Sequence, residues 1–289
     1  KIGPRSNASG RMQNGKEAVA LLVERNFKSA YNNADMINHY NEQRKDLDKA
    51  MTEEANKIVE NLKENNDHKA IVIYNEEWHK GVIGIVASRL TEIYFQPAVV
   101  LTRTDDLATG SARSVAGFDI YSAIASCRDI LENFGGHTYA AGLSLKVEHI
   151  PEFKRRFEEY VQKNILHEQT LPNIDIDAVI GFQDITHKLF MDMKRFQPFG
   201  PDNKKPVFCS EHVFDYGTSK VVGREQEHIK LELVDNKSSK IMNGIAFGQS
   251  SQARYIKTKQ SFDIVYTLED NTHKRGEIQL QIEDIRPSE

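Results

Sequence analysis

Residues 70–101 read AIVIYNEEWHKGVIGIVASRLTEIYFQPAVVL, and this stretch decides the fold class. The apolar run at 70–74 is typical of a buried strand, and a second apolar run follows at 97–101. Between them, residues 82–94 place apolar side chains at helical spacing. The order strand, helix, strand predicts a right-handed βαβ unit with parallel strands, and hence a mixed α/β fold. Ligands of such sheets bind at the carboxyl ends of the strands, where residues 76–81 lie.

The first 64 residues are predicted to form a helical linker region. Residues 3–11 are polar and punctuated by glycine, which indicates a loop, and residues 16–26 are expected to form a short helix. Neither Gly nor Pro occurs from residue 33 to residue 62, and apolar residues recur near helical spacing among many charges. This pattern predicts one helix ~45 Å long. Its narrow apolar seam suits a strut between domains.

The rest of the chain is predicted to form an α/β domain, a connector and a barrel. In the α/β domain (65–165), Asp119 is expected to cap a second helix that ends at residues 134–136. Residues 166–203 are the connector. Residues 204–289 are typical of a small OB-like barrel, because five short β runs occur there with a helical piece before the fourth. The runs lie at residues 207–216, 228–234, 241–247, 261–268 and 277–285.

Composition excludes several classes of protein. The 289 residues suffice for two modest domains, and 39% hydrophobic with 28% charged residues is typical of a soluble protein. No run approaches ~18 apolar residues, and the first residues lack both Met and the apolar core of a signal peptide. We therefore expect a piece excised from a longer cytoplasmic protein. The net charge of −4 excludes a uniformly basic nucleic-acid binder, so any nucleic acid must lie in a local basic groove.

Three small glycine-bearing sites fall in the first half of the chain, at residues 78–81, 110–114 and 135–137. Each sets bare backbone N–H groups beside a histidine or an arginine, as a phosphate site requires. Taken singly, each has a plain structural alternative: a surface histidine, a strand with a surface arginine, or a helix cap. Together, within one α/β unit, they predict a surface that holds a phosphodiester backbone.

Five segments of the chain, taken together, form a recognisable set. They are GPRSNASGRM (3–12), WHKGVIGIVASRL (78–90), GSARS (110–114), FGGHTYAAGLSL (134–145) and QPFGPDNKKPVF (197–208). In this order and spacing they resemble the RecJ family of bacterial single-stranded-DNA-specific exonucleases, in the portion that follows the catalytic DHH domain. GGH alone is shared with other members of the DHH phosphoesterase superfamily, whereas the Pro-Phe-Gly-Pro element before a barrel favours RecJ.

The resemblance implies a 5′→3′ exonuclease of DNA repair and recombination, acting on single-stranded DNA. Its DHH domain binds two divalent ions, Mn²⁺ or Mg²⁺, and an OB domain grips the DNA. This chain has no Asp-His-His motif, and we interpret Asp175 and Asp177 as polar residues of the connector and not as metal ligands. We therefore expect no metal site in this chain and no activity from it alone. Cys127 and Cys209 have no spacing that would close a zinc site. We expect a monomer, with a single-strand binding protein as a candidate partner.

Residue chemistry within these motifs assigns candidate roles. Arg113 is the first candidate for a clamp on the 5′-phosphate, because a guanidinium binds phosphate through two parallel hydrogen bonds. His137 is expected to reach the scissile phosphate and to act in catalysis. The other candidate phosphate-binding residues are Ser111, Ser114, Gly135, Gly136, His79, Arg5 and Arg11. In the barrel, the candidates for stacking on bases are Tyr216, Phe247, Tyr255 and Tyr266, and those for phosphate contacts are Lys220, Arg224, Lys257 and Lys259.

Two other functions stay open at this point. One is a phosphodiesterase of the same superfamily that cleaves short oligonucleotides or cyclic dinucleotides, although such an enzyme needs no OB domain. The other is a non-catalytic module that binds nucleic acid or docks a partner.

Overall fold

The computed structural model describes residues 2–63, 68–200, 202–238, 240–271 and 276–288. The chain divides into two compact units, residues 1–172 and residues 173–289. Each unit has its own core, so each is described by itself.

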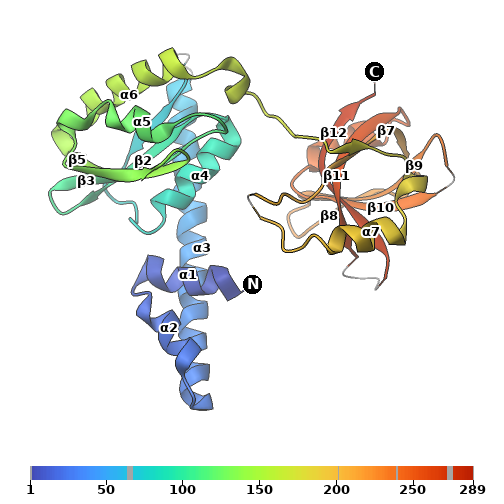
Figure 1. The fold of residues 1–289 in the computed structure, drawn as a ribbon, viewed down its shortest axis with the longest axis horizontal. Coiled ribbons are helices and arrows are strands. Elements are labelled where there is room, and N and C mark those ends of the chain that lie inside the picture. The colour runs from blue at the N-terminus through green and yellow to red at the C-terminus, as the bar shows by residue number, and fades with distance from the viewer. Residues whose placement is uncertain (1, 64–67, 201, 239, 272–275, 289) are drawn as a thin grey trace. The chain divides into compact units, whose positions relative to one another are not determined.

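The first unit begins with three helices, α1 (Ile2–Met12), α2 (Lys16–Val23) and α3 (Phe27–Lys63). The long helix was predicted, and its 37 residues make it ~55 Å long. The prediction of a loop at residues 3–11 is wrong, because these residues form α1, which packs on α3 (Figure 1). Ala8 and Ser9 are fully buried in this contact. Tertiary packing therefore outweighs the low helix propensity of the glycines.

The βαβ unit is confirmed, and it opens a five-stranded sheet of order β1-β2-β3-β5-β4. Strands β1 and β2 pair directly and in parallel, and helix α4 connects them along the chain. The other neighbouring strands of the sheet pair antiparallel. The predicted helix end at residues 134–136 is wrong, because the helix α5 already ends at Ala125 and these residues lie in a strand. The bounds are β1 (Ile71–Tyr74), α4 (Ile83–Tyr94), β2 (Ala98–Thr104), β3 (Leu107–Arg113), α5 (Ile120–Ala125), β4 (Asn133–His137), β5 (Ala140–Lys146) and α6 (Ile150–Asn164).

Helices cover the two faces of this sheet unequally. Helices α5 and α6 lie on one face, where the buried side chains come from all the strands except β4 (Figure 1). Helices α3 and α4 lie on the other face, where the buried strand residues come from β1 and β2 alone. Among the described residues, no buried hydrophobic side chain of β4 or β5 belongs to this second core. The second face of β4 and β5 is therefore left without an apolar cover.

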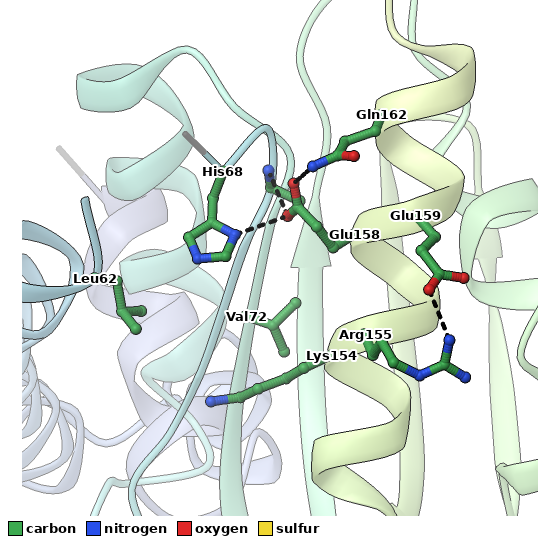
Figure 2. Close-up of a pocket in the computed structure, with 9 residues that line it drawn as sticks. Leu62, His68, Val72, Lys154, Arg155, Glu158, Glu159 and Gln162 are labelled. Carbon is green, nitrogen blue, oxygen red and sulfur yellow. Dashed lines mark hydrogen bonds and ion pairs between the residues drawn. The ribbon is translucent and has the colours of Figure 1, made fainter. Parts of the chain in front are cut away.

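Three carboxylates join the helices to one another and to the segments around the sheet. Asp48 of α3 accepts two hydrogen bonds from the Arg89 guanidinium of α4, at 2.8 and 2.9 Å. Glu54 of α3 accepts the indole N–H of Trp78 at 2.8 Å, which holds the loop before α4. Glu158 of α6 accepts the backbone N–H groups of residues 69 and 70 at the start of β1, beside a pocket of about 310 Å³ (Figure 2). The layers are thus joined by charge-assisted hydrogen bonds as well as by packing.

The second unit is the predicted OB-like barrel. The strand order β6-β7-β11-β12-β10-β9-β8, with a further pairing between β7 and β9, closes five strands into a barrel. All five predicted runs are strands, and the helical piece α8 precedes the fourth of them. Two short edge strands, β6 and β8, were not predicted. The bounds are β6 (Ala178–Val179), α7 (His187–Lys194), β7 (Phe208–Asp215), β8 (Lys220–Val222), β9 (His228–Asp235), β10 (Ile241–Ala246), α8 (Ala253–Ile256), β11 (Phe262–Asp270) and β12 (Ile278–Pro287).

Candidate phosphate and nucleic-acid interface

Two of the predicted site residues lie in one row across the sheet. Arg113 of β3 and His137 of β4 are both in register with Ala140 of β5, the strand between them. Residues directly opposite one another on paired strands point to the same face. Arg113 is also opposite Ala98, which is buried on the α4 face. The guanidinium and the imidazole therefore stand on the α4 face, with their Cα atoms ~9.5 Å apart.

Arg113 lies where the sheet meets the first turn of α4. A Cβ atom on Gly84 of that turn would lie 3.1 Å from Arg113 Nη2 and 3.3 Å from Ser111 Oγ. The Nη1 group donates to the carbonyl of Ala112 at 2.8 Å, which fixes the plane of the guanidinium. Because Ser111 is two residues before Arg113 on the same strand, its hydroxyl shares this face. This contact, called the Arg113 site below, thus combines a guanidinium, a hydroxyl and the first turn of a helix.

The Arg113 site carries positive charge that no carboxylate of the described residues pairs with. Burial lowers the pKa of the Arg113 guanidinium, and the nearby positive charge of Arg11 lowers it further. Within the described residues, no carboxylate lies within 4 Å of either arginine. An anion bound at Arg113 would offset this repulsion, and a guanidinium binds phosphate through charge-assisted hydrogen bonds. The surroundings of Arg113 therefore fit a phosphate site, with the positive charge of Arg11 nearby.

His137 is exposed at the end of β4, where it closes the hairpin to β5. Its Nδ1 atom accepts the backbone N–H of Tyr139 at 3.3 Å. In the neutral ring this leaves Nε2 as the N–H donor. The imidazole can therefore donate a hydrogen bond to an oxygen above the open face of the sheet.

The structure assigns other predicted residues to structural contacts. Ser114 donates its hydroxyl to the carbonyl of Phe118 at 2.6 Å, and Arg5 donates to Asn38 at 2.6 Å in the contact of α1 with α3. The half-buried His79 accepts the backbone N–H of Gly81 at 3.1 Å and so orders the turn before α4. These three side chains are thus used by the fold, whereas Arg113 and Ser111 are brought together beside Gly84.

The two glycines of the GGH motif differ in their surroundings. Gly136 has φ +151°, and a Cβ atom there would collide with the backbone of residues 140 and 141. Gly135 has nothing within 4 Å of an added Cβ atom. The fold therefore requires glycine at position 136 and leaves position 135 open.

Sequence reasoning missed four residues of the open face: Gly142 and Ser144 of β5, Asn133 of β4 and Thr109 of β3. The signal was present in residues 140–146, where small residues alternate with buried apolar ones. What the pattern could not supply was the strand register that brings Thr109 and Asn133 opposite Ser144.

The four aromatic side chains proposed to stack on bases differ in how far they are exposed on the barrel. Tyr216 and Phe247 are each 55% exposed, although the Phe247 ring also packs in a T-shaped contact with the His228 imidazole, with centroids 5.0 Å apart. Tyr255 packs half-buried against the core and donates its hydroxyl to the carbonyl of Ser261 at 3.2 Å. Tyr266 is fully buried, burial raises the pKa of its hydroxyl, and that hydroxyl is hydrogen-bonded to Ser210 at 2.8 Å. The prediction that Tyr266 stacks on a base is therefore wrong.

The basic candidates of the barrel gather in two places. Lys257 and Lys259 share with Tyr216 a hollow of about 690 Å³ at the end of β7. Lys220 of the edge strand β8 is directly opposite Lys230 of β9. Arg224 is exposed in the turn between these two strands. The first group combines a ring face with two ammonium groups, the pairing that single-stranded nucleic acid requires.

Neither a metal site nor a membrane span is found within the described ranges. No group of three or more His, Cys, Asp or Glu side chains there could hold a metal ion. None of the described helices is long and apolar enough to cross a membrane. Cys127 and Cys209 are both buried, and burial raises the pKa of each thiol.

Comparison with known proteins agrees with this architecture. Residues 67–163 match the DHHA1 domain, and residues 176–284 match the RecJ OB domain. The chain is 34% identical to the single-stranded-DNA-specific exonuclease RecJ of Bacillus subtilis and 29% identical to that of Haemophilus influenzae. These alignments cover 100% and 99% of this chain, but only 36% and 51% of the two relatives.

A solved structure shows the same fold. The crystal structure of RecJ in complex with Mn²⁺ from Thermus thermophilus aligns over 100% of this chain and 41% of that one, with a TM-score of 0.81 and 24% identity. The chain therefore belongs to the RecJ family and corresponds to the C-terminal portion that carries the DHHA1 and RecJ OB domains.

Proposed function

We propose that this chain is the part of a RecJ exonuclease that binds single-stranded DNA and holds its 5′ end. The observation that carries this proposal is the Arg113 guanidinium, which stands with the Ser111 hydroxyl beside Gly84 in the first turn of α4 and has no carboxylate within 4 Å among the described residues. A terminal phosphate carries nearly two negative charges and several acceptor oxygens. Arg113 would bind it through parallel hydrogen bonds, while Ser111 adds a hydroxyl donor.

His137 would act on the next phosphate along the strand. His137 is opposite Ala140 of β5, and Arg113 is opposite the same residue from the other side, so the two side chains share a face. The Nε2 group of His137 can donate a hydrogen bond. A donor fixed in this way stabilises negative charge that develops on a phosphate oxygen during hydrolysis. Rigid strands hold both groups, so the spacing between them is set before the DNA binds.

The barrel would hold the single strand farther from its 5′ end. Tyr216 offers an exposed ring, and Lys257 and Lys259 border the same hollow. Stacking on an aromatic ring and contact with phosphates are independent of base sequence. Phe247, Lys220 and Arg224 would extend this surface.

Hydrolysis itself would be performed by a DHH domain that carries Mn²⁺ or Mg²⁺, because this chain has no Asp-His-His motif. Exposed apolar side chains support the docking of a further domain against α2 and the start of α3. Leu22, Val23, Phe27 and Tyr31 are 66–85% exposed. Apolar patches of this kind mark protein contacts. The whole enzyme would act 5′→3′ in DNA repair and recombination in the cytoplasm, as a monomer and with a single-strand binding protein as a candidate partner.

Binding of this chain to labelled nucleic acids, measured by fluorescence polarisation, tests the proposal. A single-stranded 12-mer should bind more tightly than its duplex or a cyclic dinucleotide, and the affinity should fall steeply with salt. Preference for the duplex or the cyclic dinucleotide would overturn it. With Mn²⁺ or Mg²⁺ the chain alone should leave the 12-mer intact; degradation that is abolished by a mutation in this chain would contradict the assignment of hydrolysis to another domain.

A further inference from the structure

We propose that the outer edge of strand β1 is a docking site for an extended peptide of a partner protein, which pairs with Val72 and places an acidic side chain on Lys154. The site is the pocket of about 310 Å³ that β1, the end of α3 and helix α6 enclose (Figure 2). It lies within the first unit, and it uses none of the residues proposed above to bind DNA.

Strand β1 is the last strand of its sheet, and no strand of the described chain pairs with its outer edge. Ile71 donates its backbone N–H to the carbonyl of Pro97 on the β2 side, at 2.9 Å. Asn75 donates in the same direction, to the carbonyl of Leu101 at 3.2 Å. Because successive residues of a strand alternate in direction, Val72 directs its N–H and C=O groups away from β2. The outer edge therefore offers a donor and an acceptor to a further strand.

The fold itself satisfies only the beginning of this edge. Glu158 of α6 accepts the backbone N–H of Lys69 at 2.7 Å and that of Ala70 at 3.1 Å. Ala70 precedes Val72 by two residues and so points in the same direction, which means that a carboxylate takes the place of a neighbouring strand there. The pocket opens beside the next outward residue, Val72. An unpaired edge of this kind is a template for the addition of a peptide strand.

Lys154 supplies a cation that the fold leaves without a partner. Its side chain lies in the pocket beside Val72 (Figure 2). Among the described residues no carboxylate lies within 4 Å of its Nζ atom, and the neighbouring Glu159 is paired with Arg155 at 2.6 Å. Burial lowers the pKa of the ammonium group, because hydration is lost without a compensating charge. A carboxylate from a ligand would supply that charge through a charge-assisted hydrogen bond.

The two walls of the pocket select the sequence of the peptide. Val72 belongs to the core on the α6 face of the sheet, and a residue paired opposite it points to the same face, where Lys154 lies. The next residue of the peptide points to the α3 face, where the 39% exposed side chain of Leu62 offers an apolar contact. An extended segment that alternates acidic and apolar side chains therefore fits both walls.

Binding of two synthetic peptides to this chain, measured by fluorescence polarisation, tests the inference. The probe is fluorescein-labelled Val-Glu-Val-Glu-Val, and the contrasting peptide has lysine in place of each glutamate. The chain should bind the acidic probe, and Lys154→Met should weaken this binding about tenfold, since one hydrogen bond between charged groups is lost. Lys163→Met, on an exposed position of the same helix, is the matched control and should bind the probe as wild type does. Both variants should keep the wild-type affinity for a single-stranded DNA 12-mer.

Two further measurements test the pairing with β1 and do not depend on a substitution in the protein. Saturating probe should slow amide hydrogen exchange at Val72, whereas Ile71, already bonded on the β2 side, should change little. A probe methylated on its backbone nitrogens keeps both carboxylates but cannot donate to the edge. It should bind about tenfold more weakly than the unmethylated probe.

Several results would overturn the inference. They are no binding of the acidic probe, equal binding of the acidic and basic peptides, wild-type affinity in Lys154→Met, and protection that does not include Val72. A dimer of the wild-type chain in sedimentation, abolished by Lys154→Met, would assign the edge to a second copy and would also overturn it. The proposed DNA binding is judged separately, by the affinity of the wild-type chain for the 12-mer.

Discussion

Arg113 and His137 are in register with the same residue, Ala140, so a guanidinium and an imidazole stand on one face of the sheet with a single strand between them. The two residues are 24 positions apart in sequence, and α5 lies between them. Their spacing is set by backbone hydrogen bonds and not by loops. A site built in this way is pre-organised, which favours interactions that strengthen in the transition state.

His137→Ala in the whole enzyme should lower kcat by about 10²–10³, or about 2.7–4 kcal/mol of barrier, because one fixed donor is lost. The affinity for DNA should change much less, since the hydrogen bond strengthens only as charge develops on the phosphate. Single-turnover rates and equilibrium binding measured on the same variant separate the two effects. A normal kcat with weaker binding would restrict His137 to a role in holding the ground state.

Asp48→Asn should lower the free energy of unfolding by about 1–3 kcal/mol. The Asp48 carboxylate is buried and accepts both hydrogen bonds from Arg89, which raises the pKa of the arginine. The effect should be smaller than for a fully buried pair, because the Arg89 side chain is 49% exposed and regains water. Urea denaturation measures it, with the exposed Asp46→Asn as control. Equal stabilities for the two variants would contradict a structural role for the pair.

Lys154→Met should make the protein more stable at neutral pH. The Lys154 side chain lies in the pocket beside Val72 and points away from Glu159, which is paired with Arg155 (Figure 2). Burial lowers the pKa of its ammonium group. Because the folded-state pKa is below the unfolded value, the folded state carries a penalty at neutral pH. This penalty disappears as the pH rises through the folded pKa towards the ordinary value near 10.4.

The difference in stability between this variant and wild type should therefore shrink between pH 7 and pH 10. Thermal midpoints at several pH values measure it. Lys163→Met, on an exposed position of the same helix, should show no such trend. A difference that does not depend on pH would mean that the added methyl group, and not the lost charge, stabilises the variant.

Hydrophobic periodicity predicted most of the fold. The βαβ unit, the long helix and the five barrel strands all have a strong apolar pattern of their own. The two wrong elements were both rich in glycine, at residues 3–11 and 134–136. In each case contacts with distant segments, α3 or β5, decide the structure, and local propensity cannot report such contacts.

The candidate site was predictable in composition but not in arrangement. Glycine-rich motifs pointed to Arg113, Ser111 and His137, because cations beside bare backbone are typical of phosphate sites. Only the register shows which side chains share a face. Register also explains why Gly142 belongs to the surface, although it lies outside the three motifs that drew attention. Tyr266 was misassigned since a period-two pattern cannot tell the inside of a barrel from its outside.

The central claim, that Arg113 holds the 5′-phosphate of single-stranded DNA, is tested most directly by one binding cycle. The affinities of the wild-type chain and of Arg113→Lys are measured for the same single-stranded 12-mer with a 5′-phosphate and with a 5′-hydroxyl. Arg155→Met, on the other side of the sheet, serves as the control. Lysine keeps the charge but cannot form two parallel hydrogen bonds, so it should weaken binding of the phosphorylated strand about tenfold. Binding of the hydroxyl strand should change little. Equal losses on both strands, or no loss on either, would contradict the account.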